Sequence, residues 1–284
     1  YVERQTELCA IAAHNFPALD LNHISVRNDD GVAYLEAMSP VDCIFLDPAR
    51  RNEHGGKTVA ISDCEPNVAK LEGLLLSKAN RIMIKLSPML DLSQALKELP
   101  HTQEVHIISV NNECKELLLL LGQTAPEEIP VHCVNLSTKG EQEKQLFVFT
   151  REQEQHSECS YTDTLGNYLY EPNASLLKAG AFRSIAAAYS VKKLHPNSHL
   201  YTSETQIEGF PGRTFRIINR CSLNKKEIKE NLSDLKKANI TVRNFPATVA
   251  ELRKRIKLAE GGDTYLFAST LNDGQKILIR CGKV

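Results

Sequence analysis

The sequence lacks the long apolar segment that a membrane-spanning helix requires. Its apolar runs, such as Leu117–Leu121, are far shorter than the roughly 18 residues needed to cross a bilayer. The first residues, Tyr1–Ala13, contain acidic side chains and no cleavage pattern, so they do not resemble a signal peptide. We therefore expect a protein without a membrane partner, located in the cytoplasm.

Closely spaced cysteine pairs are also absent. The eight cysteines are scattered along 284 residues and form no C-x-x-C motif. Structural zinc sites use ligands at short paired spacings, whereas isolated cysteines in a long chain are mostly small buried hydrophobic residues. The sequence therefore predicts no metal site and no disulfide framework, and the scattered histidines are interpreted as structural or surface groups.

The whole chain has no large excess of positive or negative charge, but its C-terminal part has an excess of positive charge. The chain has 34 Lys and Arg against 35 Asp and Glu, and its 42% of hydrophobic residues exclude a disordered protein. Residues 211–284 hold 16 basic and 7 acidic residues, a net charge of +9, whereas residues 1–210 hold 18 and 28, a net charge of −10. A basic module on an acidic body predicts either contact with a nucleic-acid backbone or electrostatic attachment to the acidic part.

In the first half, short apolar segments alternate with segments of helical periodicity. We expect strands at 1–3, 23–26, 43–46, 81–86, 105–110, 131–136 and 145–150, and helices at 5–14, 32–38, 66–79, 92–98 and 113–121. Such alternation favours an open, mostly parallel α/β sheet with helices on both faces, and the last two strands are expected to be antiparallel.

The second half begins with a polar stretch, 151–160, that is interpreted as a linker. A helix is expected around 175–189. The remainder predicts the order βαβαββ, with strands at 214–219, 240–243, 264–268 and 276–280 and helices at 225–235 and 249–258. Asn272-Asp273-Gly274 is a hairpin signal between the last two strands. This is the pattern of a small α+β domain of the ferredoxin-like type.

Polar side chains follow three successive strands of the first half. They are Glu3, the pair Asn28-Asp29, and Asp47 followed by Pro48. Ligands of open α/β sheets bind beyond the carboxyl ends of the strands. A carboxylate there can accept two hydrogen bonds from a ribose diol, so the sequence predicts a site for a ribose-bearing ligand. The alternative for each residue alone is a solvated strand end or, for Asp47, a turn.

These residues also carry a resemblance to a known family. Tyr1-Val2-Glu3-Arg4, Asn28-Asp29 and Phe45-Leu46-Asp47-Pro48-Ala49-Arg50-Arg51 resemble class I S-adenosylmethionine-dependent methyltransferases. The resemblance is closest to a bacterial group with a THUMP-like or ferredoxin-like C-terminal domain, which Tyr170-Glu171-Pro172, Arg243-Asn244-Phe245 and 261–267 resemble. It implies a Rossmann-like methyltransferase domain at 1–152, a linker or THUMP-like connecting region at 153–208, and a basic ferredoxin-like domain at 209–284.

The resemblance implies a role for each strand-end residue. Glu3 would hold the ribose of S-adenosylmethionine, and Asn28 or Asp29 its adenine. Asp47 and Pro48 would lie against the group that accepts the methyl, where the proline fixes the turn and directs nearby acceptors inward. Arg50 and Arg51 would bind a phosphate of a nucleic-acid substrate, or else pair with the acidic surface.

One feature of the family is missing from the sequence. No glycine-rich loop precedes Glu3, so the chain resembles a methyltransferase without its first strand and loop, either because it is a fragment or because the loop has been lost. A sheet without that strand would expose an apolar edge, from which self-association is expected.

Two functions remain open from the sequence. The first is a methyltransferase that acts on RNA, and the second is a non-catalytic RNA-binding protein built on a degenerate methyltransferase scaffold. Phe245, Tyr265 and Phe267 could stack on bases, although packing in the core is expected for at least two of them. A methyltransferase for a protein or small molecule is a third, weaker reading.

Overall fold

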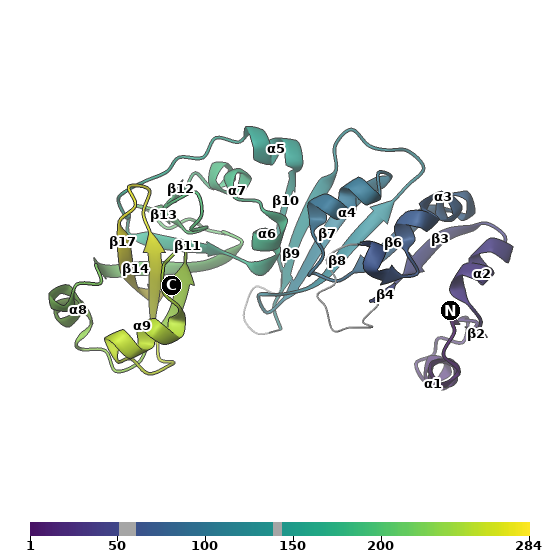
Figure 1. Ribbon diagram of the computed structural model, residues 1–284, viewed down its shortest axis with the longest axis horizontal. Helices are drawn as coiled ribbons and strands as arrows, with labels where there is room; N and C mark the ends of the chain where they lie inside the picture. The colour runs from purple at the N-terminus through teal and green to yellow at the C-terminus, as the bar shows by residue number, and fades with distance from the viewer. Residues whose placement is uncertain (51–60, 139–143) are drawn as a thin grey trace. The chain divides into compact units, whose positions relative to one another are not determined.

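A computed structural model describes residues 1–50, 61–138 and 144–284 (Figure 1). By their contacts these residues form two units, each of which is described by itself. Unit 1 comprises Tyr1–Val105 and Glu116–Ile129, and unit 2 comprises His106–Lys115 and Pro130–Val284. The boundary between the units falls within two strands, β7 (Thr102–Val110) and β8 (Glu113–Leu121).

Most helices of unit 1 begin at a polar capping residue. The unit contains α1 (Thr6–Ala18), α2 (Gly31–Ala37), α3 (Val68–Lys78), α4 (Leu92–Glu98) and a 3₁₀ turn at Ile61–Asp63. The side chains of Asp30, Asn67 and Asp91 accept hydrogen bonds from the first backbone N–H groups of α2, α3 and α4. None of the helices in the described part of the chain has the length and apolar character needed to span a bilayer.

Two parallel strand pairs lie at the start of the chain, as expected, but the sheet is not mostly parallel, since the strand at Ala79–Leu86 is antiparallel to β8. The strands of unit 1 are β1 (Val2–Glu3), β2 (Arg27–Asn28), β3 (Val41–Leu46), β4 (Ala49–Arg50), β5 (Cys64–Glu65) and β6 (Ala79–Leu86). β1 pairs with β2 in parallel, and β3 pairs in parallel with β6. Helix α3 packs against β6 (Figure 1). Ile82 and Ile84 of β6 are buried.

One six-stranded sheet has the order β10-β9-β7-β8-β6-β3. Its last strands are β9 (Pro130–Leu136) and β10 (Lys144–Thr150), which are antiparallel as predicted. Among the described residues, β3 ends the sheet and leaves Val41 and Phe45 43% and 58% exposed.

The prediction of a helix over 113–121 is wrong, because this segment is strand β8, antiparallel to β6. Asn111 and Asn112 both have positive φ, at 51° and 64°, and join β7 to β8. Two such residues form the turn that matches the twist of a β-hairpin, and asparagine tolerates this conformation. The leucine run favours a helix locally, but Leu117, Leu119 and Leu121 are instead buried in the sheet.

Three further boundaries differ from the prediction. The expected linker contains helix α5 (Arg151–His156), which begins at a capping box made by Thr150 and Gln153. The helix expected around 175–189 is broken into α6 (Ala174–Ala179) and α7 (Arg183–Ala188), because Gly180 ends α6 in the left-handed conformation. The second strand lies at Arg27–Asn28 rather than 23–26.

Unit 2 contains a seven-stranded sheet of order β12-β13-β11-β14-β17-β16-β15. Its strands are β11 (Tyr168–Pro172), β12 (Lys192–Lys193), β13 (Tyr201–Ser203), β14 (Gly212–Cys221), β15 (Asn239–Arg243), β16 (Thr264–Thr270) and β17 (Lys276–Lys283). With α8 (Lys225–Leu232) and α9 (Val249–Ile256), the last part of the chain has the predicted order βαβαββ. β11, β12 and β13 belong to the segment expected to connect the domains, and they extend the same sheet.

Candidate active site

A cavity of about 500 Å³ lies in unit 1 at the carboxyl ends of β1 and β3. Its volume is in the range that small-molecule and cofactor sites occupy. Three of the predicted site residues, Glu3, Asp47 and Pro48, line it. The other polar lining residues are Arg4, Gln5, Asp30, Glu65, Asn67 and Lys70, and the apolar ones include Val2, Val32, Leu35, Phe45, Leu46 and Leu71.

Asn28 lies beside the cavity but uses its side chain to hold β1. Glu3 and Asn28 are opposite each other in the pairing of β1 with β2. The Asn28 amide donates to the backbone oxygens of Glu3, at 2.9 Å, and Arg4, at 3.1 Å, and its own oxygen accepts from Thr6 Oγ1. Asn28 therefore fixes the turn that presents Glu3, and it is not among the lining residues.

The two carboxylates that follow β2, Asp29 and Asp30, differ in whether they line the cavity. Asp29 Oδ1 accepts from the N–H of Asp30, and Asp29 does not line the cavity. Asp30 does line it, and its carboxylate accepts from the N–H groups of Val32 and Ala33 at the start of α2. Residue 30 thus takes the cavity position that the strand-end pattern predicted for residue 28 or 29.

Asp47 follows β3 and forms an ion pair with Lys85, which lies near the end of the neighbouring strand β6. The distance from Lys85 Nζ to Asp47 Oδ2 is 2.7 Å, and Glu116 Oε2 lies 3.8 Å from the same amine. The hydrogen bond to Asp47 raises the pKa of Lys85, although partial burial opposes the effect. The Asp47 side chain is half exposed, so it can still accept hydrogen bonds from a ligand.

The segment after Asp47 is held by a short antiparallel pair. Ala49 in β4 lies opposite Glu65 in β5, and Arg50 lies opposite Cys64. Glu65 also forms an ion pair with Arg4 at 3.1 Å, which links this segment to the end of β1. Arg50 ends β4, and Arg51 lies outside the residues that the structure describes.

Sequence reasoning missed Asp30, Arg4 and Lys85 at this site. An N-cap pattern in Asp30-Gly31 could have assigned Asp30, since an aspartate directly before a helix is a capping signal. Lys85 could not be found in the same way, because it comes before a strand end and meets Asp47 only through the pairing of β3 with β6.

The aromatic residues of the C-terminal part belong to its core, as expected for most of them. Phe267 is fully buried, and Tyr265 packs against Phe215 with ring centroids 4.9 Å apart. Phe245 packs against a second buried cluster that includes Leu252 and Leu266. None of the three is therefore placed as an open stacking platform.

The basic residues of this part are mostly on the surface. Exposed Lys and Arg side chains lie at 216, 220, 225, 226, 229, 236, 237, 254, 255, 257, 276 and 283. Arg253 is the exception in the run 253–255, because it donates to the backbone oxygen of Ala238 and pairs with Glu260.

Comparison with known proteins gives two kinds of match. A family model described as a ferredoxin-like domain matches residues 168–211, and one described as a THUMP-like domain matches residues 212–283. A solved structure of a "putative methyltransferase" from Porphyromonas gingivalis W83 is similar over 100% of this chain and 71% of its own, with a TM-score of 0.90 and 39% identity.

Two other comparisons give no informative relative. A modification subunit of a "putative type I restriction enzyme" from Vibrio vulnificus YJ016 matches 57% of this chain and 44% of its own at a TM-score of 0.34 and 10% identity, too low to carry an argument. No curated protein matches the chain.

The fold and the strand-end cavity define a Rossmann-like methyltransferase sheet, here with an α+β ferredoxin-like C-terminal part. At this identity and coverage, the chain belongs to the same family as the Porphyromonas gingivalis protein. The predicted recognition and fold class are thereby confirmed.

Proposed function

We propose that this protein is an S-adenosylmethionine-dependent methyltransferase that acts on RNA. The observation that carries the proposal is the cavity at the ends of β1 and β3, which places Glu3 and Asp47 on the wall of one space. Membership of a family that includes a methyltransferase-like structure, and a THUMP-like C-terminal match, support the reaction class and the nucleic-acid partner.

The residues of the cavity fit this cofactor in size and chemistry. About 500 Å³ accommodates a nucleoside with an amino-acid tail. The Glu3 carboxylate can accept from two ribose hydroxyls, and Asp30, which lines the cavity where Asn28 and Asp29 do not, offers an acceptor for an adenine amino group. Apolar side chains of Val32, Leu35 and Leu71 supply walls for a planar base. The bound cofactor would supply an electrophilic methyl group.

The protein's own contribution to the transfer is positioning. Asp47 can accept a hydrogen bond from the amine that receives the methyl, and Lys85 holds the Asp47 carboxylate in place. Pro48 restricts the turn that follows, so that the acceptor group meets a fixed wall. Alignment of this kind accounts for much of the catalysis in a displacement reaction. Arg50 and Arg51 would bind a backbone phosphate of the RNA.

The second candidate is a non-catalytic RNA-binding protein on a degenerate methyltransferase scaffold. The observation that favours it is the use of Asn28 and Asp29 in holding the backbone, which removes two predicted cofactor contacts from the cavity. Under this alternative the basic C-terminal residues would bind RNA, and the cavity would bind no cofactor.

Calorimetric titration of S-adenosylmethionine, with RNA binding measured in parallel, separates the candidates. We expect one cofactor per chain, and Glu3→Ala should weaken it at least about tenfold, because a charge-assisted hydrogen bond contributes about 1.5–3 kcal/mol. RNA affinity should not change. Glu7→Ala, a neighbouring glutamate outside the cavity lining, is the matched control. No cofactor binding by the wild type would support the scaffold alternative, and equal binding by the wild type and Glu3→Ala would contradict the role of Glu3.

We also propose the domain division 1–152, 153–208 and 209–284, a cytoplasmic location, and self-association through the exposed edge of the sheet. The observation behind the last proposal is the exposure of Val41 and Phe45 on β3.

A further inference from the structure

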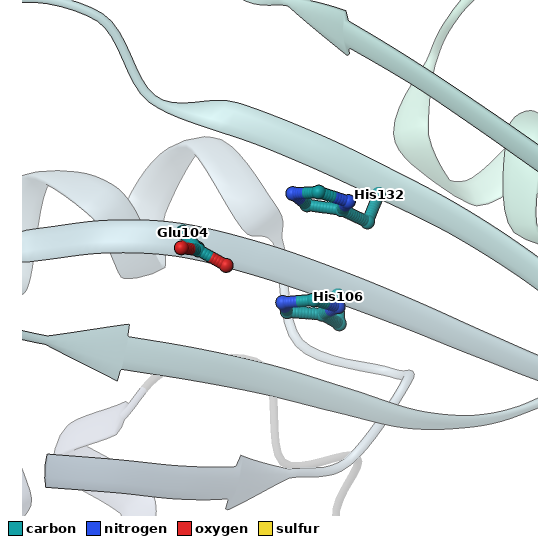
Figure 2. Close-up of side chains that lie close together, drawn as sticks. All are labelled: Glu104, His106 and His132. Atoms are coloured by element: carbon teal, nitrogen blue, oxygen red, sulfur yellow. The ribbon is translucent and has the colours of Figure 1, made fainter.

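Two histidines and a glutamate lie close together on the six-stranded sheet (Figure 2). Glu104 precedes His106 by two residues on β7, so both side chains lie on the same face of that strand. His132 comes from β9, the next strand in the sheet. The two imidazole rings are stacked, with centroids 4.4 Å apart and planes 8° from parallel.

These three side chains offer a ligand set for a divalent transition metal. One ligand atom from each lies within 4.8 Å of the others, and all three residues are partly buried. Two imidazole nitrogens with one carboxylate oxygen are ligands of zinc and related ions. The imidazole of histidine binds such ions through a ring nitrogen.

The separation of the ligand atoms is close to what zinc needs. Bonds of about 2.0–2.1 Å in a tetrahedral site place neighbouring ligands about 3.4 Å apart. Small rotations about the side-chain bonds of these partly buried residues would bring 4.8 Å down to that distance.

We propose that His106, His132 and Glu104 bind one Zn²⁺ ion, or a divalent ion of similar ligand preference, that ties β7 to β9. Three protein ligands leave a fourth position for water. Cys133 does not join the set, because consecutive side chains of a strand point to opposite faces and its thiol is fully buried on the other face. This inference is independent of the proposed methyl transfer, since none of its residues lines the cavity.

The sequence predicted no metal site, because these three residues do not form a recognisable ligand spacing along the chain. His106 and His132 are 26 residues apart and belong to different strands. Only the sheet order makes them neighbours.

Zinc titration of the full chain, read by calorimetry and by thermal unfolding, tests the proposal. We expect one Zn²⁺ per chain and a rise in Tm of a few degrees on saturation. His132→Gln and Glu104→Gln should each weaken binding at least about tenfold, because even indirect partners of a metal contribute that much. His23→Gln, an exposed histidine elsewhere, should bind like the wild type. Equal affinity in all variants, or no binding by the wild type, would overturn the proposal.

Loss of zinc binding in these variants could also result from misfolding, so a further variant is designed to gain affinity for zinc. Val148 on β10 lies directly opposite His132 and is 44% exposed, so Val148→His adds a third imidazole on the same face. We expect this variant to bind Zn²⁺ more tightly than the wild type and to give Co²⁺ the visible spectrum of a nitrogen and oxygen site. Unchanged affinity, or a thiolate charge-transfer band, would contradict the assignment.

Discussion

Asp47 and Glu3, the two carboxylates at the centre of the proposal, are each held by a polar partner from another part of the chain. Lys85 holds Asp47 through an ion pair, and Asn28 holds the backbone at Glu3. Because the hydrogen bond to Asp47 raises the pKa of Lys85 above its usual 10.5, the lysine stays charged at neutral and mildly alkaline pH. The charge of Lys85, and with it the ion pair, is lost as the pH rises through that raised pKa.

In the C-terminal part, Glu171 is also held by basic side chains from other strands, here two arginines. This arrangement leads to a stability prediction. Its buried carboxylate accepts from Arg213 of β14 and from Arg243 Nη2 of β15, the latter at 2.9 Å. Glu171→Ala removes the acceptor shared by both arginines, so we expect the free energy of unfolding to fall by about 2 kcal/mol. The arginines are partly exposed, which keeps the loss below that of a fully buried pair.

Urea denaturation measures this loss. Glu208→Ala, which removes an exposed glutamate, should change the free energy of unfolding by less than about 0.5 kcal/mol. Equal stability of the two variants would mean that Glu171 does not hold β14 and β15 together.

At the scale of elements, the sequence predicts most of unit 1 because its strands and helices follow simple patterns. The bounds of α4 agree with the prediction residue by residue, and those of α2, α3, β3 and β6 agree within two residues. β8 could not be predicted from its leucines, since that run fits a buried helix as well as a buried strand. The two-residue Asn111-Asn112 turn was the available signal.

The candidate site could be predicted only where it depends on strand ends. Glu3 ends β1, and Asp47 and Pro48 directly follow β3, so the positions of these strands bring them to the cavity. Lys85, His106 and His132 depend on which strands are neighbours, and local sequence does not encode sheet order.

The exposed strand β3 carries a prediction about association. Val41 is 43% exposed at the edge of the sheet, where unpaired backbone groups can pair with another strand. Val41→Lys should therefore weaken self-association at least about tenfold, because a charged side chain on an edge strand opposes pairing. Sedimentation equilibrium measures the effect.

The matched control is Ile218→Lys, which places the same charge at a 56% exposed position on β14, a central strand. It should leave association unchanged. If both variants associate like the wild type, or if the wild type is monomeric, the edge of β3 does not drive association.

The whole molecule combines an acidic N-terminal part, which contains the cavity, with a basic C-terminal part that has the THUMP-like match. Residues 211–284 carry a net charge of +9, and most of their Lys and Arg side chains are exposed. Under the proposed function, the basic surface would bind the RNA backbone and the cavity would hold the methyl donor. Binding of RNA should then weaken as salt increases.

The central claim is tested most directly by transfer of a labelled methyl group from S-adenosylmethionine to a total RNA pool. We predict that the wild type labels RNA and that Asp47→Ala lowers the rate at least about 100-fold, since correct alignment supplies much of the catalysis. Asp42→Ala, which removes an exposed aspartate of the same strand, should retain the wild-type rate. A wild-type protein that binds both cofactor and RNA but transfers no methyl group, or an Asp47→Ala variant as fast as the wild type, would contradict the account.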